Sequence, residues 1–247
     1  MPCTADAVRC GFSLVLLHDL ATAAECETLR AEASETACAV RERMENGISL
    51  QAIAEVSIGD PESAPDQVRM PIATMLGHPS QRLCDRILQR GVERLAEELP
   101  TLLRSLFGDL FDGDAAGDGV GDGVCRPSLT RSDRLVFTQG EPACNVYTAG
   151  GQFTPHEDRQ SLTILVPLSA PCAFEGGGTG FWSNEVRGPT GISGVRALEL
   201  HGPPSLVVKE KRGTALVFGG DMTHSGQAVL SGERTVFVGS FSSAGGS

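Results

Sequence analysis

Residues 145–158 read Asn-Val-Tyr-Thr-Ala-Gly-Gly-Gln-Phe-Thr-Pro-His-Glu-Asp, and they decide how the rest of the chain is interpreted. The stretch ends in a His-x-Asp pair, His156 and Asp158. In an extended chain, side chains two positions apart point to the same face, so the imidazole and the carboxylate would converge on one point. Such pairs are common by chance, so this one needs support from elsewhere in the chain.

A second stretch, residues 213–238, supplies His224 and, ten positions later, Arg234. Two imidazoles and one carboxylate can hold one face of a metal ion and leave three positions open, which is the ligand set of non-haem Fe(II) oxygenases. Histidine and carboxylate donors also bind zinc, and the plain alternative is two ordinary histidines beside an unrelated aspartate. The spacing therefore indicates a candidate metal site.

Further motifs surround these residues. They are, in chain order, Tyr147 nine residues before His156, Leu162-Thr-Ile-Leu-Val-Pro-Leu, Phe174-Glu-Gly-Gly-Gly-Thr-Gly-Phe, Gly213-Thr-Ala-Leu-Val-Phe and His224-x-Gly-x-x-Val-x-x-Gly-x-Arg234. Over residues 134–242 the chain resembles the 2-oxoglutarate- and Fe(II)-dependent oxygenases of the prolyl 4-hydroxylase-like group. Each motif alone is weak, but the combination in this order is specific.

The resemblance implies a fold and a division of the chain. We expect an α+β protein whose double-stranded β-helix, or jelly-roll, core is braced by N-terminal helices. Residues 1–107 form an N-terminal strand and helical support region, residues 108–133 a mobile loop rich in Gly and Asp, and residues 134–247 the oxygenase core. The metal lies at one open end of the β-helix.

The resemblance also implies roles for single residues. His156, Asp158 and His224 become the catalytic ligands of Fe(II). The retained carboxylate argues for hydroxylation or another oxidative C–H reaction, because related halogenases replace it with a small residue. Arg234 holds the distal carboxylate of 2-oxoglutarate, for which the planar fork of guanidinium donors is well matched. The alternative for Arg234 is an ordinary strand arginine in a salt bridge. Two hydroxyls face the same pocket, those of Tyr147 and Thr163.

The expected reaction is that of a dioxygenase. An unactivated C–H bond of a prolyl, other amino-acid, peptidyl or small-molecule substrate is hydroxylated by O₂, with release of succinate and CO₂. Ascorbate is a further candidate cofactor. Two alternatives stay open: a cupin-like metal dioxygenase that uses no 2-oxo acid, and a non-catalytic β-barrel that serves as a binding module.

Periodicity predicts the other elements. A strand covers 11–17, and a helix begins at the capping box of Thr22 and Glu25 and runs to about Met44. A short strand is expected near 69–75, followed by a helix from about Ser80 that Pro100 breaks and a shorter helix to Phe107. Short β-rich runs follow at 134–138, 143–148, 162–167, 179–182, 205–208, 214–218, 227–230 and 234–241.

A Gly- and Asp-rich tract spans residues 108–123. Asp112, Asp114 and Gly117 match positions 1, 3 and 6 of an EF-hand loop, but position 12 is Gly123 instead of Glu. The composition therefore favours a mobile loop, which we expect to close over the barrel mouth when substrate binds.

Composition limits the partners. The 31 acidic and 20 basic residues give a formal net charge of −11, so nucleic acid is an unsuitable partner. The sequence has no run of 18 apolar residues and no signal-peptide pattern, which predicts neither a membrane span nor export. Eight scattered cysteines without a Cys-x-x-Cys pair are typical of free thiols in a reducing compartment, and we expect a cytoplasmic protein.

Overall fold

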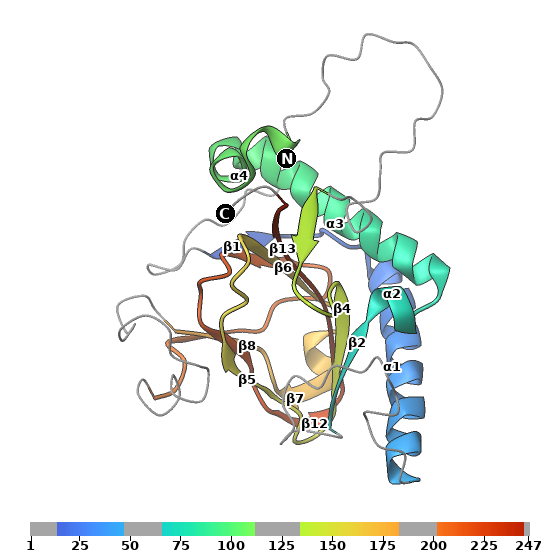
Figure 1. Cartoon of the computed structure of the whole chain (residues 1–247). Coiled ribbons are helices and arrows are strands. Elements are labelled where there is room, and N and C mark those ends of the chain that lie inside the picture. The colour runs from blue at the N-terminus through green and yellow to red at the C-terminus, as the bar shows by residue number, and fades with distance from the viewer. Residues whose placement is uncertain (1–13, 47–65, 112–133, 183–201, 245–247) are drawn as a thin grey trace.

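Two antiparallel sheets and a layer of helices form the structure, a computed structural model that describes residues 14–46, 66–111, 134–182 and 202–244 (Figure 1). The large sheet has seven strands. Its order is β1 (Leu14–Leu17), β10 (Ala215–Phe218), β6 (Leu162–Pro167), β13 (Arg234–Ser243), β4 (Ala143–Tyr147) and β2 (Gln67–Pro71), and β3 (Leu135–Phe137) also pairs with β13.

The second sheet has four strands in the order β5 (Phe153–His156), β11 (His224–Gly226), β8 (Thr179–Phe181) and β9 (Leu206–Val208). Two further strands, β7 (Phe174–Gly176) and β12 (Val229–Gly232), form a separate ribbon. Each sheet combines strands from distant parts of the sequence, so the cavity between the sheets is assembled from both halves of the core.

Helices cover the outer face of the large sheet (Figure 1). They are α1 (Ala23–Glu45), α2 (Ile72–Met75), α3 (His78–Glu98) and α4 (Pro100–Phe107), followed by the 3-10 turn Gly108–Phe111; a second such turn covers Pro171–Ala173. The predicted capping box is present, because the Thr22 hydroxyl accepts from the backbone N–H of Glu25 at 3.2 Å and the Glu25 carboxylate accepts from that of Thr22 at 2.8 Å. The predicted break at Pro100 separates α3 from α4.

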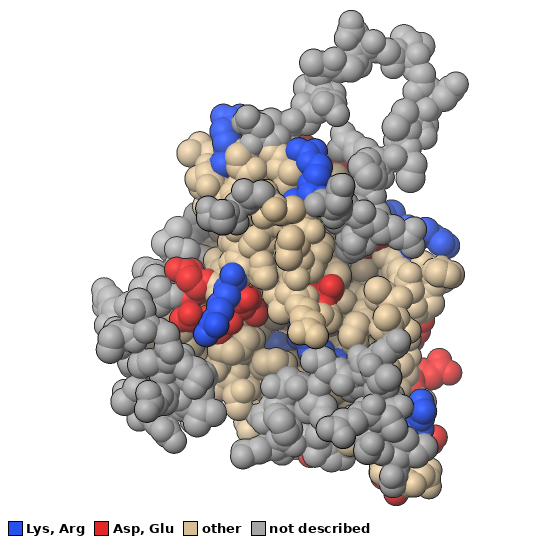
Figure 2. Space-filling view, in the orientation of Figure 1, with Lys and Arg blue, Asp and Glu red and all other residues tan. Residues whose placement is uncertain are grey.

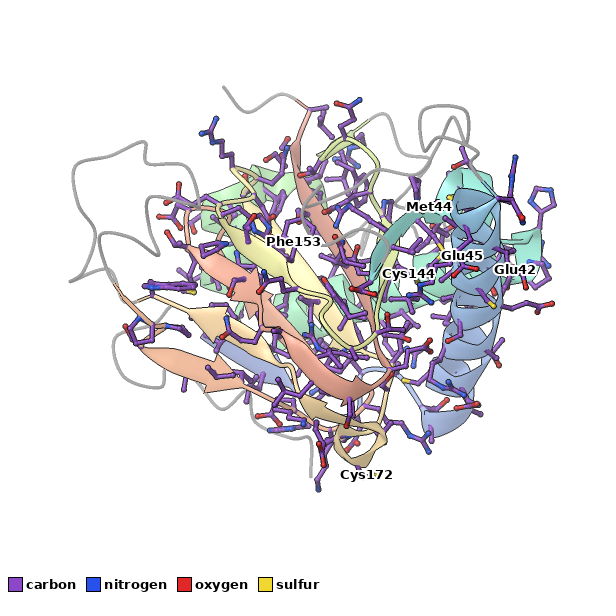
Figure 3. All side chains as sticks on the ribbon, turned by 90° about the horizontal axis from the view of Figure 1, so that it is seen from below. Glu42, Met44, Glu45, Cys144, Phe153 and Cys172 are labelled. Atoms are coloured by element: carbon purple, nitrogen blue, oxygen red, sulfur yellow. The ribbon has the colours of Figure 1, made fainter. Side chains whose placement is uncertain are left out.

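Alternation along the strands of the large sheet divides the core into two clusters. Cys144 and Val146 of β4 belong to the cluster under the helices, whereas Ala143 and Tyr147 belong to the cluster between the sheets. In Figure 3, Cys144 lies on the side of β4 that faces α1. The inward side of the same strand is thus left to line a cavity.

Some predicted boundaries were wrong. The strand expected near 69–75 runs from Gln67 to Pro71, and residues 72–75 form the short helix α2. Pro71 has no N–H to donate to a continuing ladder, so the strand ends there. Strands β5, β7 and β11 were not predicted, because three or four residues are too few for a visible alternation.

The expected N-terminal support region, residues 1–107, and the β core are not separate in the structure. Strands β1 and β2 belong to the large sheet, so the region up to residue 107 supplies core strands as well as helices. The expected loop at 108–133, with its calcium-loop comparison, lies outside the described residues from 112 onward. In the described part of the chain, no helix combines the length and the apolar character needed to cross a membrane.

Charge on the described surface gathers at the edges of the face drawn in Figure 2. Basic side chains lie at the end that carries α4 and along one edge, acidic ones gather with a basic one at the opposite flank, and the centre is mostly uncharged. The acidic excess of the chain is therefore not concentrated over the middle of this face.

Candidate metal centre and active-site cavity

A cavity of about 310 Å³ lies between the two sheets. Its described lining combines β2, β4, β6 and β13 of the large sheet with β5, β8 and β11 of the small one. The volume is at the lower end of the range of roughly 300–1,000 Å³ that is usual for small-molecule sites. The cavity therefore fits a compact ligand, or a small ligand together with part of a larger one.

Three donor residues that the sequence singled out, His156, Asp158 and His224, lie together at the cavity wall. His156 ends β5 and pairs in register with His224 at the start of β11, with 4.3 Å between the centres of the two rings, and the Asp158 carboxylate lies near the Nε2 atoms of both. The Nε2 atom of His156 is 3.5 Å from Asp158 Oδ1, and that of His224 is 3.6 Å from Asp158 Oδ2. One ligand atom from each residue lies within 4.8 Å of the others, close enough to bind a single metal ion.

Both imidazoles are oriented by backbone carbonyls. His156 Nδ1 lies 2.8 Å from the carbonyl oxygen of Thr154, and His224 Nδ1 lies 3.0 Å from that of Met222. Because a carbonyl oxygen only accepts hydrogen bonds, each Nδ1 carries a proton, and in the neutral imidazole the lone pair is then on Nε2. The lone pairs are on the atoms that face Asp158, so the donor set fits a metal ion.

The ionisation states suit a metal as well. Burial lowers the pKa of His224 to about 4, although the carboxylate of Asp158 opposes this effect. Burial alone would raise the pKa of Asp158, but the two imidazoles and the hydroxyl of Thr163 outweigh it, so the pKa lies well below its usual range. At neutral pH, His224 and Asp158 are therefore already deprotonated and need release no proton to bind a metal.

Thr163 was expected to offer its hydroxyl to the cavity, but the structure places it behind Asp158. It is fully buried, is not among the residues that line the cavity, and donates to Asp158 Oδ2 at 2.5 Å. Its oxygen also lies 3.1 Å from that of Ser240. Thr163 thus orients the carboxylate instead of contacting a ligand.

Replacing Thr163 by valine should therefore weaken metal binding by roughly 10- to 100-fold, the usual cost of losing a hydrogen-bond partner of a ligand. Thr235→Val is the matched control, because Thr235 is equally buried and its hydroxyl has no hydrogen-bond partner in the described part of the chain. Calorimetric titration of both variants with Ni(II) measures the difference. Equal affinities would show that Thr163 does not position Asp158.

Arg234 opens β13 and faces the same cavity, directly opposite Tyr147 in the ladder. Only 4% of Arg234 is exposed. Its Nη2 donates to the Thr179 hydroxyl at 3.0 Å, and its guanidinium carbon is 5.2 Å from the centre of the Tyr147 ring. Among the described residues no carboxylate forms an ion pair with it, so a buried positive charge faces the cavity without a counter-charge.

Tyr147 is also buried and lines the cavity. Burial raises the pKa of its hydroxyl above the usual value, although the nearby Arg234 opposes this effect. The hydroxyl is therefore protonated at neutral pH and can donate a hydrogen bond. Tyr147 and Arg234 together form a donor-rich wall of the cavity that also holds the three candidate metal ligands.

The sequence did not single out two other charged residues of the lining, Arg69 and Glu141. Arg69 Nη2 donates to Glu141 Oε1, and Nη1 lies 3.4 Å from Asn145 Oδ1. The two partners of the ion pair are 72 positions apart and meet only because β2 pairs with β4. The sequence does contain a signal for Arg69, because Gln67 and Arg69 alternate with apolar residues as in a strand. Only the pairing of β2 with β4 shows that Arg69 faces the cavity.

No family model and no curated protein sequence matches the chain. Solved structures do match its fold. AviO1 from Streptomyces viridochromogenes Tue57 has 12% identity, covers 93% of this chain and 89% of its own, and superposes with a TM-score of 0.55. The non-haem α-ketoglutarate-dependent epimerase SnoN, in complex with Fe³⁺, α-ketoglutarate and nogalamycin RO, has 15% identity. The match covers 94% of this chain and 79% of SnoN, with a TM-score of 0.53.

HygX from Streptomyces hygroscopicus, with nickel, 2-oxoglutarate and hygromycin B bound, has 13% identity, covers 94% of this chain and 83% of its own, and superposes with a TM-score of 0.51. These likenesses confirm that the chain has the fold of the 2-oxoglutarate-dependent Fe(II) oxygenases, as the sequence resemblance predicted. At sequence identities of 12–15%, these matches show a shared fold and nothing further about this chain.

Proposed function

We propose that the chain is a 2-oxoglutarate- and Fe(II)-dependent dioxygenase that hydroxylates a C–H bond of its substrate. One observation carries the proposal. A converged set of two imidazoles and one carboxylate shares a cavity with a buried arginine that has no carboxylate partner among the described residues. A metal and an anion are the ligands that would satisfy these two features together.

In this proposal His156, Asp158 and His224 hold Fe(II), whose three remaining positions stay open to ligands. When bound, the iron and 2-oxoglutarate supply the oxidation: one oxygen atom of O₂ enters succinate as CO₂ leaves, and the other enters the substrate. The protein itself keeps the two Nε2 lone pairs and the carboxylate directed at one point. Thr163 fixes the carboxylate, and the backbone carbonyls of Thr154 and Met222 fix the rings.

Arg234 binds the distal carboxylate of 2-oxoglutarate in this proposal, and the Tyr147 hydroxyl donates a second hydrogen bond. The support is geometric, because both side chains are buried, line the cavity and lie side by side on paired strands. Burial also excludes water, which strengthens the interaction between the guanidinium and an anionic ligand. We further infer that the two facing sheets form a double-stranded β-helix.

The proposed substrate is a small molecule or a peptidyl group that reaches the cavity. Prolyl hydroxylases also occur among the matches, but their TM-scores of 0.45 and 0.46 do not bear on specificity. A cupin-like dioxygenase without a 2-oxo acid would leave Arg234 without a ligand. A non-catalytic barrel would need no converged donor set.

The direct test is to incubate the Fe(II)-loaded protein with 2-oxoglutarate, O₂ and a panel of free amino acids, prolyl peptides and glycosides. The proposal predicts substrate-dependent succinate formation together with a mass gain of one oxygen atom in one class of the panel, read by mass spectrometry. Omission of 2-oxoglutarate should stop the reaction. Oxygenation that proceeds without 2-oxoglutarate would favour the cupin-like alternative.

A further inference from the structure

The cavity has a second polar subsite beside the one proposed for 2-oxoglutarate. In the register of the large sheet, Tyr147 pairs with Arg234, and two residues away Asn145 pairs with both Val236 and Arg69. Side chains two positions apart on a strand share a face and are separated by roughly 7 Å. The inward face therefore presents one donor pair, Tyr147 and Arg234, and a neighbouring pair, Asn145 and Arg69.

Arg69 is held rigidly in this subsite. Its guanidinium donates to Glu141, whose other oxygen accepts from the backbone N–H of Ser240. The guanidinium carbon is also 5.9 Å from the centre of the Phe153 ring, on the opposite sheet. Phe153 in turn stacks on His156 at 4.5 Å between ring centres, which links the subsite to the candidate metal ligands. Figure 3 shows Phe153 on β5, between the two sheets.

Arg69 and Glu141 are both nearly buried, with 10% and 2% of their side chains exposed. The bonds to Glu141 and Asn145 engage two of the five N–H donors of the guanidinium, so donors remain for a ligand. The nearby Thr138 also lines the cavity, and its buried hydroxyl has no hydrogen-bond partner among the described residues. The subsite thus offers donors to a ligand that brings oxygen acceptors.

Charge narrows the chemistry of that ligand. The described lining holds two arginines, Arg69 and Arg234, against three carboxylates, those of Glu141, Glu157 and Asp158, a sum of 2 − 3 = −1. Bound Fe(II) and the dianion of 2-oxoglutarate would cancel each other and leave this sum unchanged. The charge of Arg69 is already balanced by Glu141, so a further anion would face a net negative cavity.

We propose that Arg69, with Asn145 beside it, binds the substrate that the enzyme oxidises. The group it recognises on that substrate is a neutral oxygen acceptor, a hydroxyl or a carbonyl group, and this contact determines substrate specificity. This inference rests on the proposed function, because it assigns the neighbouring Arg234 to 2-oxoglutarate. Arg69 lies on β2, outside the part of the chain that carries the oxygenase motifs. The specificity of the cavity is therefore set in part by the N-terminal region.

The test uses the full chain loaded with Ni(II) and 2-oxoglutarate, so that no turnover occurs. Two matched pairs of probes separate neutral from anionic ligands and hydroxyl from carbonyl groups: myo-inositol with myo-inositol 1-phosphate, and N-acetylglycine methylamide with N-acetylglycine. Binding is measured by ligand-observed NMR. In at least one pair the neutral member should bind more tightly than its anionic counterpart.

The variant is the double substitution Arg69→Met with Glu141→Gln, because removing Arg69 alone would leave a buried carboxylate without its partner. It should weaken binding of the neutral probe by roughly 10- to 100-fold, the value of hydrogen bonds from a charged donor. Binding of Ni(II) and 2-oxoglutarate should stay within about threefold of wild type. Arg90→Met with Glu25→Gln is the control, an Arg–Glu ion pair that lies outside the cavity and is more exposed, at 34% and 21%.

Three results would overturn the inference: tighter binding of the anionic probes, equal binding of the neutral probe by the variant, or no binding of either neutral probe at millimolar concentration. A failure of the proposed function itself would give a different result in these binding measurements. In that case the wild-type protein would bind no Ni(II) or 2-oxoglutarate at all.

Discussion

Substitution of His156, Asp158 or His224 by alanine should abolish turnover in each case and leave the fold intact. Each change removes one of three donors that lie within 4.8 Å of one another. Losing a mere hydrogen-bond partner of a ligand costs roughly 10- to 100-fold, so loss of a ligand itself should lower activity by more than about 100-fold. Succinate formation at saturating Fe(II) and 2-oxoglutarate measures the effect.

The fold should survive because the three side chains lie at the wall of the cavity, and only His224 also packs on a core side chain, Phe218, at 4.7 Å between ring centres. Thermal unfolding of the metal-free variants should therefore stay within a few degrees of wild type. His78→Ala is the matched control, an exposed histidine at the start of α3, and it should keep full activity. Near-normal activity in any one of the three cavity variants would show that the substituted residue is not a metal ligand.

Arg234→Ala should lower the affinity for 2-oxoglutarate by roughly 30-fold to several thousand-fold. The substitution would leave the distal carboxylate unpaired beside Thr179 and Tyr147, in a place where the arginine itself is 4% exposed. Losing one partner of a buried, hydrogen-bonded charge pair costs about 2–5 kcal/mol, from which the fold-change follows. The apparent KM for 2-oxoglutarate at saturating iron is the quantity to measure.

Two companions make this result specific. Arg234→Lys should recover part of the loss, because it keeps the charge but not the planar fork of donors. Arg30→Ala removes an arginine that pairs with Glu27 on the outer surface of α1, and it should leave the KM unchanged. Iron affinity should be the same in all of these variants. A wild-type KM in Arg234→Ala would make Arg234 a structural residue.

The sequence was most informative where function constrains spacing. The stretches around His156 and His224 predicted the donor set, and the structure brings those residues together on paired strands. The strands themselves were missed. β11 has three residues and a register shift between His224 and Gly226, so no alternation of period two exists to be recognised.

Contacts between distant residues could not be predicted in the same way. Alternation places Thr163 on one face of β6, but whether its hydroxyl meets a ligand or Asp158 depends on how the loop after β5 returns. The Arg69–Glu141 pair depends on the register of β2 against β4. Helices, in contrast, were readable because caps and proline breaks are local features.

The most direct test of the central claim is an anaerobic titration of the metal-free protein with Fe(II), followed by 2-oxoglutarate, in the visible absorption spectrum. The account predicts one Fe(II) per chain and a weak visible band that appears only after 2-oxoglutarate is added. The band should be absent in Asp158→Ala and should need far more 2-oxoglutarate in Arg234→Ala. Stoichiometric iron binding without any such band in the wild-type protein would contradict the proposed chelation of 2-oxoglutarate at this metal centre.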